Sequence, residues 1–309
     1  MALRLPAGIF RAMRPPQWAK NALVFAAPVA AGVMTEADKL RPTLLAFVCF
    51  CLAASGTYLL NDVRDVESDR KHPTKRNRPI AAGIVPARVA VLCAVALIAI
   101  SLLLAATVNS GLLLTMGAYL VLTTTYVVYL KFQPILDIVA VAAGYVVRTI
   151  AGATAARVPI SPWFFVVTSF GALLMVAGKR EGEATELDVD AADIRPTLGV
   201  YTPSYLTYLR SVSSGVVLVS YCLWAFESAG SAPDSLAGLA HQRVVSDVSS
   251  VLFRVSIVPF VIAILRYALL LDQGEGSEPE KLVMHDRTLQ VAGLVWAIIY
   301  ACGVYLTNS

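Results

Sequence analysis

Long apolar stretches alternate with short polar segments along most of this chain. Each is close to the roughly 20 residues that a helix needs to cross a bilayer. The stretches cover residues 17–34, 43–60, 87–108, 111–130, 134–153, 162–178, 205–226, 250–271 and 288–307. The pattern therefore predicts an all-α integral membrane protein with nine transmembrane helices.

The overall composition supports a membrane protein. The 309 residues are 57% hydrophobic, and the mean hydropathy is +0.68. Charged residues make up 15% of the chain, below the roughly 25% that is usual for soluble domains. The five cysteines lie in apolar segments without the spacing of metal ligands, so we read them as small core residues. These values exclude a soluble two-domain protein.

The first 16 residues differ in pattern from the rest of the chain. Their arginines are interleaved with apolar side chains, a pattern typical of a helix that lies on a membrane surface. We expect Pro15 and Pro16 to end this helix and residues 17–309 to form one transmembrane domain. The apolar run from Ala22 resembles the core of a signal peptide, but more apolar stretches come after it, so we interpret it as a first span.

Lysine and arginine are distributed unevenly among the segments between the spans. Cytoplasmic loops carry an excess of these residues, which predicts that the N-terminus is inside and the C-terminus outside. The two long loops, 61–86 and 179–204, then face the cytosol, where we expect them to cap the active site. We expect a multi-pass protein of the plasma membrane.

The first of these loops begins with the acidic sequence NDVRDVESD, residues 61–69. On a helix that turns by about 100° per residue, its amide and three of its carboxylates fall within an arc of roughly 100°. Oxygen ligands of this kind suit Mg²⁺. The residues concerned are Asn61, Asp62, Asp65 and Asp69.

Basic side chains lie among these acidic residues and directly after them. They can donate hydrogen bonds to phosphate oxygens. Acidic residues that can bind a metal ion, next to basic residues that can bind phosphate, predict a site for a diphosphate. The alternative is a solvated charged loop that only carries the topology signal. The basic residues are Arg64, Arg70, Lys75, Arg76 and Arg78.

The second long loop begins with Lys179, Arg180 and Glu183. If the preceding helix continues, the spacings of three and four residues place Glu183 on the same side as both cations. This predicts either an exposed, ion-paired helix end or a second contact for phosphate and metal. Asp188, Asp190 and Asp193 form no such one-sided set, and we interpret them as part of a solvated loop.

Other polar residues lie close to or within the predicted spans. Arg148 follows Asp137 by eleven residues, which places both on one helix face, and a charge at that depth needs a partner or a polar cavity. Arg148 therefore either forms an internal ion pair or lines a polar cleft open to the cytosol. Lys20, Tyr126 and Lys131 lie near the expected inner surface, as interface anchors or as contacts for an anionic substrate.

The acidic segment resembles the NDxxDxxxD signature of the UbiA-type intramembrane prenyltransferases. The resemblance runs over nearly the whole chain and implies a bundle of nine helices with a polar cleft that faces the cytosol. It also implies Mg²⁺ as cofactor, with Asn61, Asp62, Asp65 and Asp69 as metal ligands and the three aspartates as catalytic residues. The chain departs from the family at residues 179–183, where KREGE replaces a second acidic motif, commonly DxxxD.

The flanking motifs are similar to one branch of that family, whose members transfer phosphoribosyl from phosphoribosyl diphosphate to decaprenyl phosphate. Their product is the lipid-linked ribose precursor of cell-wall arabinan. The motifs are RPPQWAKN (14–21), HPTKRNRPIAAG (72–83), YVVYLK (126–131), LDI (136–138), RTIAGA (148–153) and AGKREGE (177–183).

The resemblance implies a division of the basic residues between two substrates. The donor phosphates fall to Lys75, Arg76, Arg78, Lys179 and Arg180, and the acceptor phosphate to Lys20, Lys131 and Arg148. Partners are thus phosphoribosyl diphosphate, a polyprenyl phosphate lipid and the membrane, with no nucleic acid and with a homo-oligomer left open. Two alternatives stay open: an aromatic or quinone-precursor prenyltransferase, and a transporter of an anionic metabolite.

Overall fold

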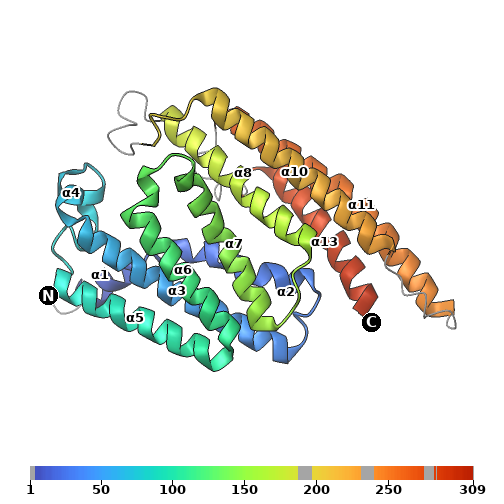
Figure 1. The fold of residues 1–309 in the computed structure, drawn as a ribbon, viewed down its shortest axis with the longest axis horizontal. Coiled ribbons are helices and arrows are strands. Elements are labelled where there is room, and N and C mark those ends of the chain that lie inside the picture. The colour runs from blue at the N-terminus through green and yellow to red at the C-terminus, as the bar shows by residue number, and fades with distance from the viewer. Residues whose placement is uncertain (1–3, 187–196, 231–239, 275–281, 283, 309) are drawn as a thin grey trace. The chain divides into compact units, whose positions relative to one another are not determined.

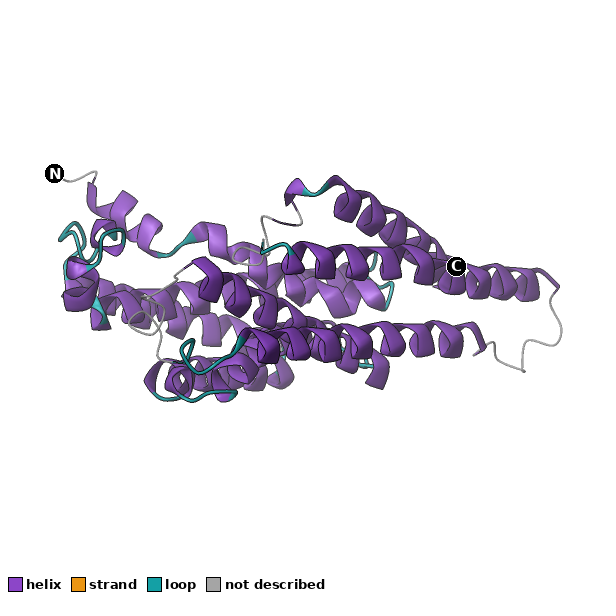
Figure 2. Ribbon diagram, turned by 90° about the horizontal axis from the view of Figure 1, so that it is seen from above, coloured by secondary structure: helices purple, strands orange, loops and turns teal. Residues whose placement is uncertain are grey.

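The computed structural model describes residues 4–186, 197–230, 240–274, 282 and 284–308. All regular secondary structure in these ranges is helical, joined by turns and loops (Figure 2). The prediction of an all-α protein is confirmed. Residues 187–196, which include Asp188, Asp190 and Asp193, lie outside the described ranges, so the predicted solvated loop stays a prediction.

The helices follow one another closely along the chain (Figure 1). They are α1 (Arg4–Ala12), η1 (Pro15–Phe25), α2 (Ala26–Ala30), α3 (Ala37–Arg64), α4 (Val66–Lys71), η2 (Lys75–Asn77), α5 (Ala87–Val108), α6 (Ser110–Val128), η3 (Leu130–Phe132), α7 (Leu136–Ala156), α8 (Pro162–Glu186), α10 (Pro203–Gly230), α11 (Ala240–Asp272) and α13 (Arg287–Asn308).

Eight helices in the described part of the chain are long and apolar enough to cross a membrane, namely α3, α5, α6, α7, α8, α10, α11 and α13. Each of them covers one of the predicted apolar stretches. The first stretch, residues 17–34, is not among them. The count of nine spans and the N-in, C-out orientation therefore stay predictions.

The first apolar stretch folds mainly as the 3₁₀-helix η1, which begins with Pro15 and Pro16. Its 11 residues are unusual, because 3₁₀-helices rarely exceed three or four. A 3₁₀-helix rises by about 2.0 Å per residue, so η1 and α2 together extend over roughly 30 Å. That length is close to the thickness of a hydrocarbon core.

One face of η1 packs on the long helix α3. A 3₁₀-helix has three residues per turn, so Trp18, Asn21 and Val24 lie in a row. The Trp18 indole N–H donates to the Ser55 hydroxyl at 3.1 Å, and the Asn21 amide donates to the Cys51 sulfur at 3.4 Å. These contacts, one α-helical turn apart on α3, favour the 3₁₀ repeat of η1.

The described residues divide into two compact units, which we treat separately. The first unit comprises Met1–Val29, Val33–Tyr129 and Val147–Pro159. One of its two cores includes Val24, Phe50 and Met116. The second core includes Leu59 and Val85, and the apolar side of α1 packs against it through residues such as Ile9. This packing ties the N-terminal helix to the acidic end of α3. The membrane-surface location of α1 stays a prediction.

The second unit comprises Ala30–Gly32, Leu130–Val146 and Ile160–Ser309. Helix α8 packs against α10, and α11 packs against α10 and α13. An aromatic cluster joins the last three of these helices, with Tyr221 and Trp224 on α10, Phe253 on α11, and Trp296 and Tyr300 on α13. Aromatic packing therefore stabilises the C-terminal helices.

Gly152 allows helix α7 to lie directly against η1 within the first unit. A Cβ atom at this position would lie 1.7 Å from the carbonyl oxygen of Val24. Gly152 is one α-helical turn after Arg148, and Val24 is one 3₁₀ turn after Asn21. The close approach of the two backbones therefore brings Asn21 and Arg148 within hydrogen-bonding distance, at 2.8 Å.

We expect Gly152→Ala to lower the free energy of unfolding by about 3 kcal/mol, because the added methyl group overlaps backbone that has no room to move. Gly117→Ala is the matched control on α6, where an added Cβ would meet nothing within 4 Å. The control should be neutral or slightly stabilising, since alanine is the better helix former. Thermal unfolding in detergent measures both. Equal melting temperatures would contradict this account of the α7–η1 contact.

Candidate functional site

The acidic segment lies where two helices of the first unit meet. Helix α3 ends at Arg64, α4 begins at Val66, and Asp65 is the junction. Asp62 and Asp69 are buried, with 2% and 3% of their surface exposed. Two carboxylates are therefore buried close to a helix junction, and buried carboxylates need nearby cations.

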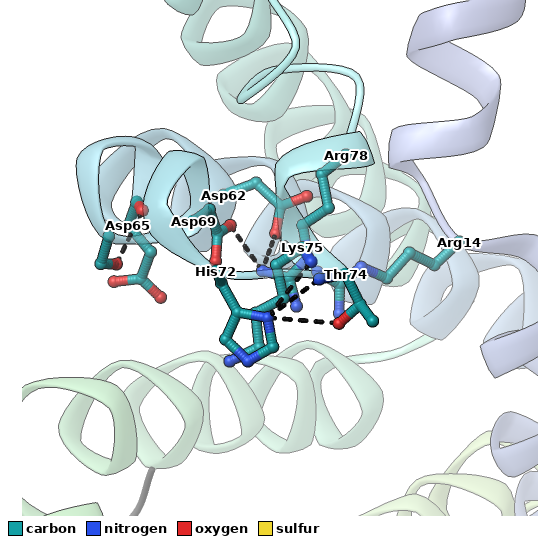
Figure 3. Close-up of polar contacts among 9 residues, drawn as sticks. Arg14, Asp62, Asp65, Asp69, His72, Thr74, Lys75 and Arg78 are labelled. Atoms are coloured by element: carbon teal, nitrogen blue, oxygen red, sulfur yellow. Dashed lines mark hydrogen bonds and ion pairs between the residues drawn. The ribbon is translucent and has the colours of Figure 1, made fainter. Parts of the chain in front are cut away.

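Two arginines from other segments supply positive charge to these carboxylates (Figure 3). Arg78 Nη1 lies 3.2 Å from Asp62 Oδ1 and 2.7 Å from Asp69 Oδ2. Arg14 Nη2 lies 2.5 Å from the same Asp62 Oδ1. One guanidinium thus bridges both carboxylates, and a second contacts the Asp62 oxygen that the first one uses.

Asp65 lies apart from this cluster (Figure 3). The prediction of one shared face assumed a single continuous helix over residues 61–69, whereas α3 and α4 meet at Asp65. In the described part of the chain, no three acidic, histidine or cysteine side chains converge on a point where they could hold a metal ion.

The donor set nevertheless fits Mg²⁺ in chemistry. Asn61, Asp62, Asp65 and Asp69 offer hard oxygen atoms, which this ion prefers. Two of the carboxylates already converge on one cation, the guanidinium of Arg78. These four residues are therefore the candidate ligands for a divalent ion.

The remaining predicted residues of this loop have mixed environments. Arg70 Nε donates to the Ala81 carbonyl at 3.2 Å, and Arg64 Nη1 donates to the Val127 carbonyl at 3.2 Å. Lys75 is half-buried, and Arg76 is exposed. The structure therefore uses some of these cations to hold the loop and leaves Arg76 at its surface.

His72 shapes the turn between α4 and η2 (Figure 3). Its Nδ1 accepts from the backbone N–H of Thr74 at 3.3 Å and lies 3.2 Å from the Thr74 hydroxyl. These contacts with Thr74 hold the backbone of the turn.

Arg148 lies in a second polar cluster of the first unit, and only 8% of its surface is exposed. Its Nε donates to Asn21 Oδ1 at 2.8 Å, and its Nη2 donates to the Tyr119 hydroxyl at 3.2 Å. Its guanidinium also lies over the rings of Tyr119 and Phe50. These contacts fix the direction of the Arg148 guanidinium.

Tyr58 lies one turn before Asp62 on α3, and the guanidinium of Arg14 lies 5.1 Å from the centre of its ring. Arg14 therefore contacts both the carboxylate of Asp62 and the aromatic ring next to it.

Asp137 is the centre of a network in the second unit and is fully buried. It accepts from the hydroxyls of Tyr201 and of Thr197, the latter at 3.1 Å, and lies 3.5 Å from Arg180 Nε. Burial, followed by the hydrogen bond to Asp137, raises the pKa of Tyr201, so its hydroxyl stays a donor. The spacing of eleven residues on α7 predicts one shared helix face for Asp137 and Arg148. In the described contacts, Asp137 belongs to a cluster of the second unit and Arg148 to a cluster of the first.

Helix α8 continues to Glu186, which is the condition under which Lys179, Arg180 and Glu183 are predicted to share one side. Arg180 Nη1 lies 2.7 Å from Glu183 Oε2, and Lys179 Nζ lies 3.9 Å from Glu183 Oε1. The side chain of Arg180 is 3% exposed, whereas that of Lys179 is 37% exposed. Arg180 is thus a buried cation that contacts the buried Asp137 and the partly exposed Glu183, and Lys179 is the more accessible cation.

The other predicted contact residues are placed individually. Lys20 is half-buried on η1, and Tyr126 is half-buried near the end of α6. The Lys131 ammonium lies 4.9 Å from the centre of the Phe132 ring. Whether they contact a substrate stays a prediction.

Sequence reasoning missed several residues of these clusters. Each of Arg14, Tyr119 and Tyr201 contacts a predicted site residue that is far from it in the sequence. Their separations from these partners, 48, 29 and 64 residues, leave no local pattern. One signal was available for Arg14, because the prolines directly after it predict a turn at that position.

Comparison with known proteins adds a family match. The model of the UbiA prenyltransferase family matches residues 22–289. A decaprenyl-phosphate phosphoribosyltransferase of Corynebacterium glutamicum is 41% identical over 97% of this chain and 87% of its own length. The protein of the same name from Mycobacterium tuberculosis is 44% identical over 94% of this chain and 92% of its own length.

A solved structure shares the fold. A UbiA homolog from Archaeoglobus fulgidus bound to DMAPP and Mg²⁺ superposes with a TM-score of 0.66 and 19% sequence identity. The match covers 97% of this chain and 99% of the other. At this identity the likeness establishes the fold.

We expect Arg180→Gln to lower the free energy of unfolding by about 3 kcal/mol, because it leaves the charge of Asp137 buried without its cation. The matched change Lys179→Gln removes the same charge from a partly exposed side chain and should cost less than about 1 kcal/mol. Thermal or urea unfolding in detergent compares the two. A larger loss in Lys179→Gln would contradict the assignment of Arg180 to the interior network.

Proposed function

The chain belongs to the UbiA prenyltransferase family, and from this premise we propose that it transfers 5-phosphoribosyl from phosphoribosyl diphosphate to decaprenyl or a related polyprenyl phosphate. The products are a polyprenylphosphoryl-5-phosphoribose and diphosphate. The observation that carries the proposal is the identity of 41–44% with relatives named for this activity, over nearly the full length of the chain. In such a role the product supplies ribose for cell-wall arabinan.

The reaction exchanges one bond at C1 of the ribose for another. The bond from C1 to the diphosphate oxygen breaks, and its electron pair leaves with the diphosphate. A bond forms between C1 and an oxygen of the lipid phosphate. The lipid phosphate is ionised at neutral pH, so no residue has to remove a proton from it.

The acidic segment has the donor types for the cofactor of this reaction. Bound Mg²⁺ would neutralise the charge that develops on the leaving diphosphate. The ligands would come from Asn61, Asp62, Asp65 and Asp69. The solved relative with bound Mg²⁺ supports this assignment through the shared fold.

Basic residues bind and orient the two phosphate-bearing substrates. We assign Lys75, Arg76 and Arg78 of the first unit to the donor phosphates. We assign Lys20 and Arg148 to the acceptor phosphate, because the contacts of Arg148 with Asn21 and Tyr119 fix the direction of its guanidinium.

The KREGE segment favours a donor with more phosphate than a prenyl diphosphate. A second acidic motif would bind the diphosphate only through metal ions, whereas Lys179 can contact a phosphate oxygen directly. We place the active site on the cytosolic side of the plasma membrane, where a soluble phosphorylated sugar is available.

The test uses membranes that contain the protein and phosphoribosyl diphosphate labelled in the ribose. We expect label to enter the lipid fraction when polyprenyl phosphate is added, and EDTA to prevent this. A parallel reaction contains prenyl diphosphate and 4-hydroxybenzoate. Transfer only in the parallel reaction would replace the proposal by an aromatic prenyltransferase. Uptake of the donor into proteoliposomes without bond cleavage would replace it by a transporter.

We expect Asp62→Asn and Asp65→Asn each to lower the rate of transfer at least about 100-fold, because each removes an oxygen charge needed for the cation. Both proteins should keep the elution profile of the wild type in detergent. Glu67→Gln is the matched control, since Glu67 is an exposed carboxylate on the same short segment. Full activity in both aspartate variants would contradict the metal assignment.

We expect Lys179→Ala to raise the KM for phosphoribosyl diphosphate about tenfold with little change in kcat. The reason is that it removes a contact that is equally strong in the ground state and in the transition state. Initial rates over a range of donor concentrations measure both constants. An unchanged KM would assign Lys179 to the structural ion pairs of α8.

A further inference from the structure

We propose that Arg14 and Arg78 are counter-ions built into the acidic site, and that a divalent cation binds there by displacing at least one of them. The inference rests on the proposed function, because it concerns the same carboxylates. It goes further because it assigns the two arginines one position without metal, paired with the carboxylates, and another position when metal is bound.

The geometry of Asp62 makes the two kinds of cation exclusive. Its Oδ1 atom lies 2.5 Å from Arg14 Nη2 and 3.2 Å from Arg78 Nη1. A metal ion that bound this oxygen would approach two guanidinium groups more closely than like charges tolerate. The ion therefore needs at least one of them to leave.

Burial explains why guanidinium groups are there in the first place. Asp62 and Asp69 are almost completely buried, and a buried carboxylate without a partner is strongly destabilising. Arg78 serves both of them through one nitrogen atom, so removal of its guanidinium would leave two negative charges side by side. Without metal, the fold depends on these arginines.

The arginines are also able to leave. Their side chains are 32% and 28% exposed for Arg14 and Arg78, so each has an open direction in which to move. Arg14 also lies over the face of Tyr58, which can keep a cation after the ion pair breaks. By contrast, the buried Arg180 of the second unit is 3% exposed.

The exchange has a consequence for phosphate binding. A displaced guanidinium regains the planar set of donors that binds phosphate oxygens in pairs. Metal binding would thus release phosphate ligands at the same place, and metal and diphosphate would strengthen each other's binding. By linkage, this coupling must be equal in both directions.

The first experiment measures Mn²⁺ binding to the full-length protein in detergent by electron paramagnetic resonance, without substrate. We expect Arg78→Gln to bind Mn²⁺ at least about fivefold more tightly than the wild type, because the competing cation is gone. The matched control is Arg76→Gln, which removes the same charge from an exposed position on the same loop. Its affinity should change less than about twofold.

The two variants separate displacement from general damage. A damaged site binds the ion more weakly, and simple charge repulsion changes both variants alike. Affinity in Arg78→Gln that is equal to or weaker than in Arg76→Gln would overturn the inference. Failure of the wild type to bind Mn²⁺ would overturn the metal assignment itself, and the labelled-donor assay tests the transfer reaction independently of either outcome.

A second measurement uses the wild-type protein alone and does not depend on how a variant folds. Phenylglyoxal modifies accessible arginine side chains, and mass spectrometry reports the modified position. We expect Mg²⁺ alone to increase the labelling of Arg78, and added diphosphate to reduce it again. Labelling of Arg78 that Mg²⁺ leaves unchanged or lowers would contradict displacement.

Discussion

The first unit depends on one electrostatic constraint: two buried carboxylates lie side by side and need positive charge. Asp62 and Asp69 come from helices that meet at Asp65, and the chain supplies Arg78 from the following loop and Arg14 from the turn between α1 and η1. Arg14 adopts a left-handed backbone conformation, with φ of 55°, that costs about 1–2 kcal/mol for a residue with a side chain. The carboxylates thus connect the N-terminal segment to the loop that follows α4.

A second constraint is steric and positions Arg148. Helix α7 contacts η1 at Gly152, where no Cβ atom fits. The η1 segment in turn presents Trp18, Asn21 and Val24 in a row because it has three residues per turn. The buried arginine therefore has Asn21 as a hydrogen-bond partner, which directs its guanidinium.

Local patterns predicted the parts of the structure that local forces determine. The apolar stretches of α3 to α13 are long enough that length and hydropathy alone identify them, and the spacing of Lys179, Arg180 and Glu183 predicted their contacts on α8. Segment 17–34 was less predictable, because distant partners such as Ser55 and Cys51 favour the 3₁₀ form over the α-helix. The contact of Arg14 with Asp62 spans 48 residues, so no repeat in the sequence could have revealed it.

The two units contain the same kind of ion pair in different environments. In the second unit, Arg180 is as buried as its partner Asp137, and the Tyr201 and Thr197 hydroxyls complete the network. Displacement of Arg180 would leave the buried charge of Asp137 without a counter-ion, so this network acts as a fixed part of the fold. In the first unit the carboxylates are buried but the arginines are not. Because only the cations have access to solvent, a different cation can replace them while the carboxylates stay in place.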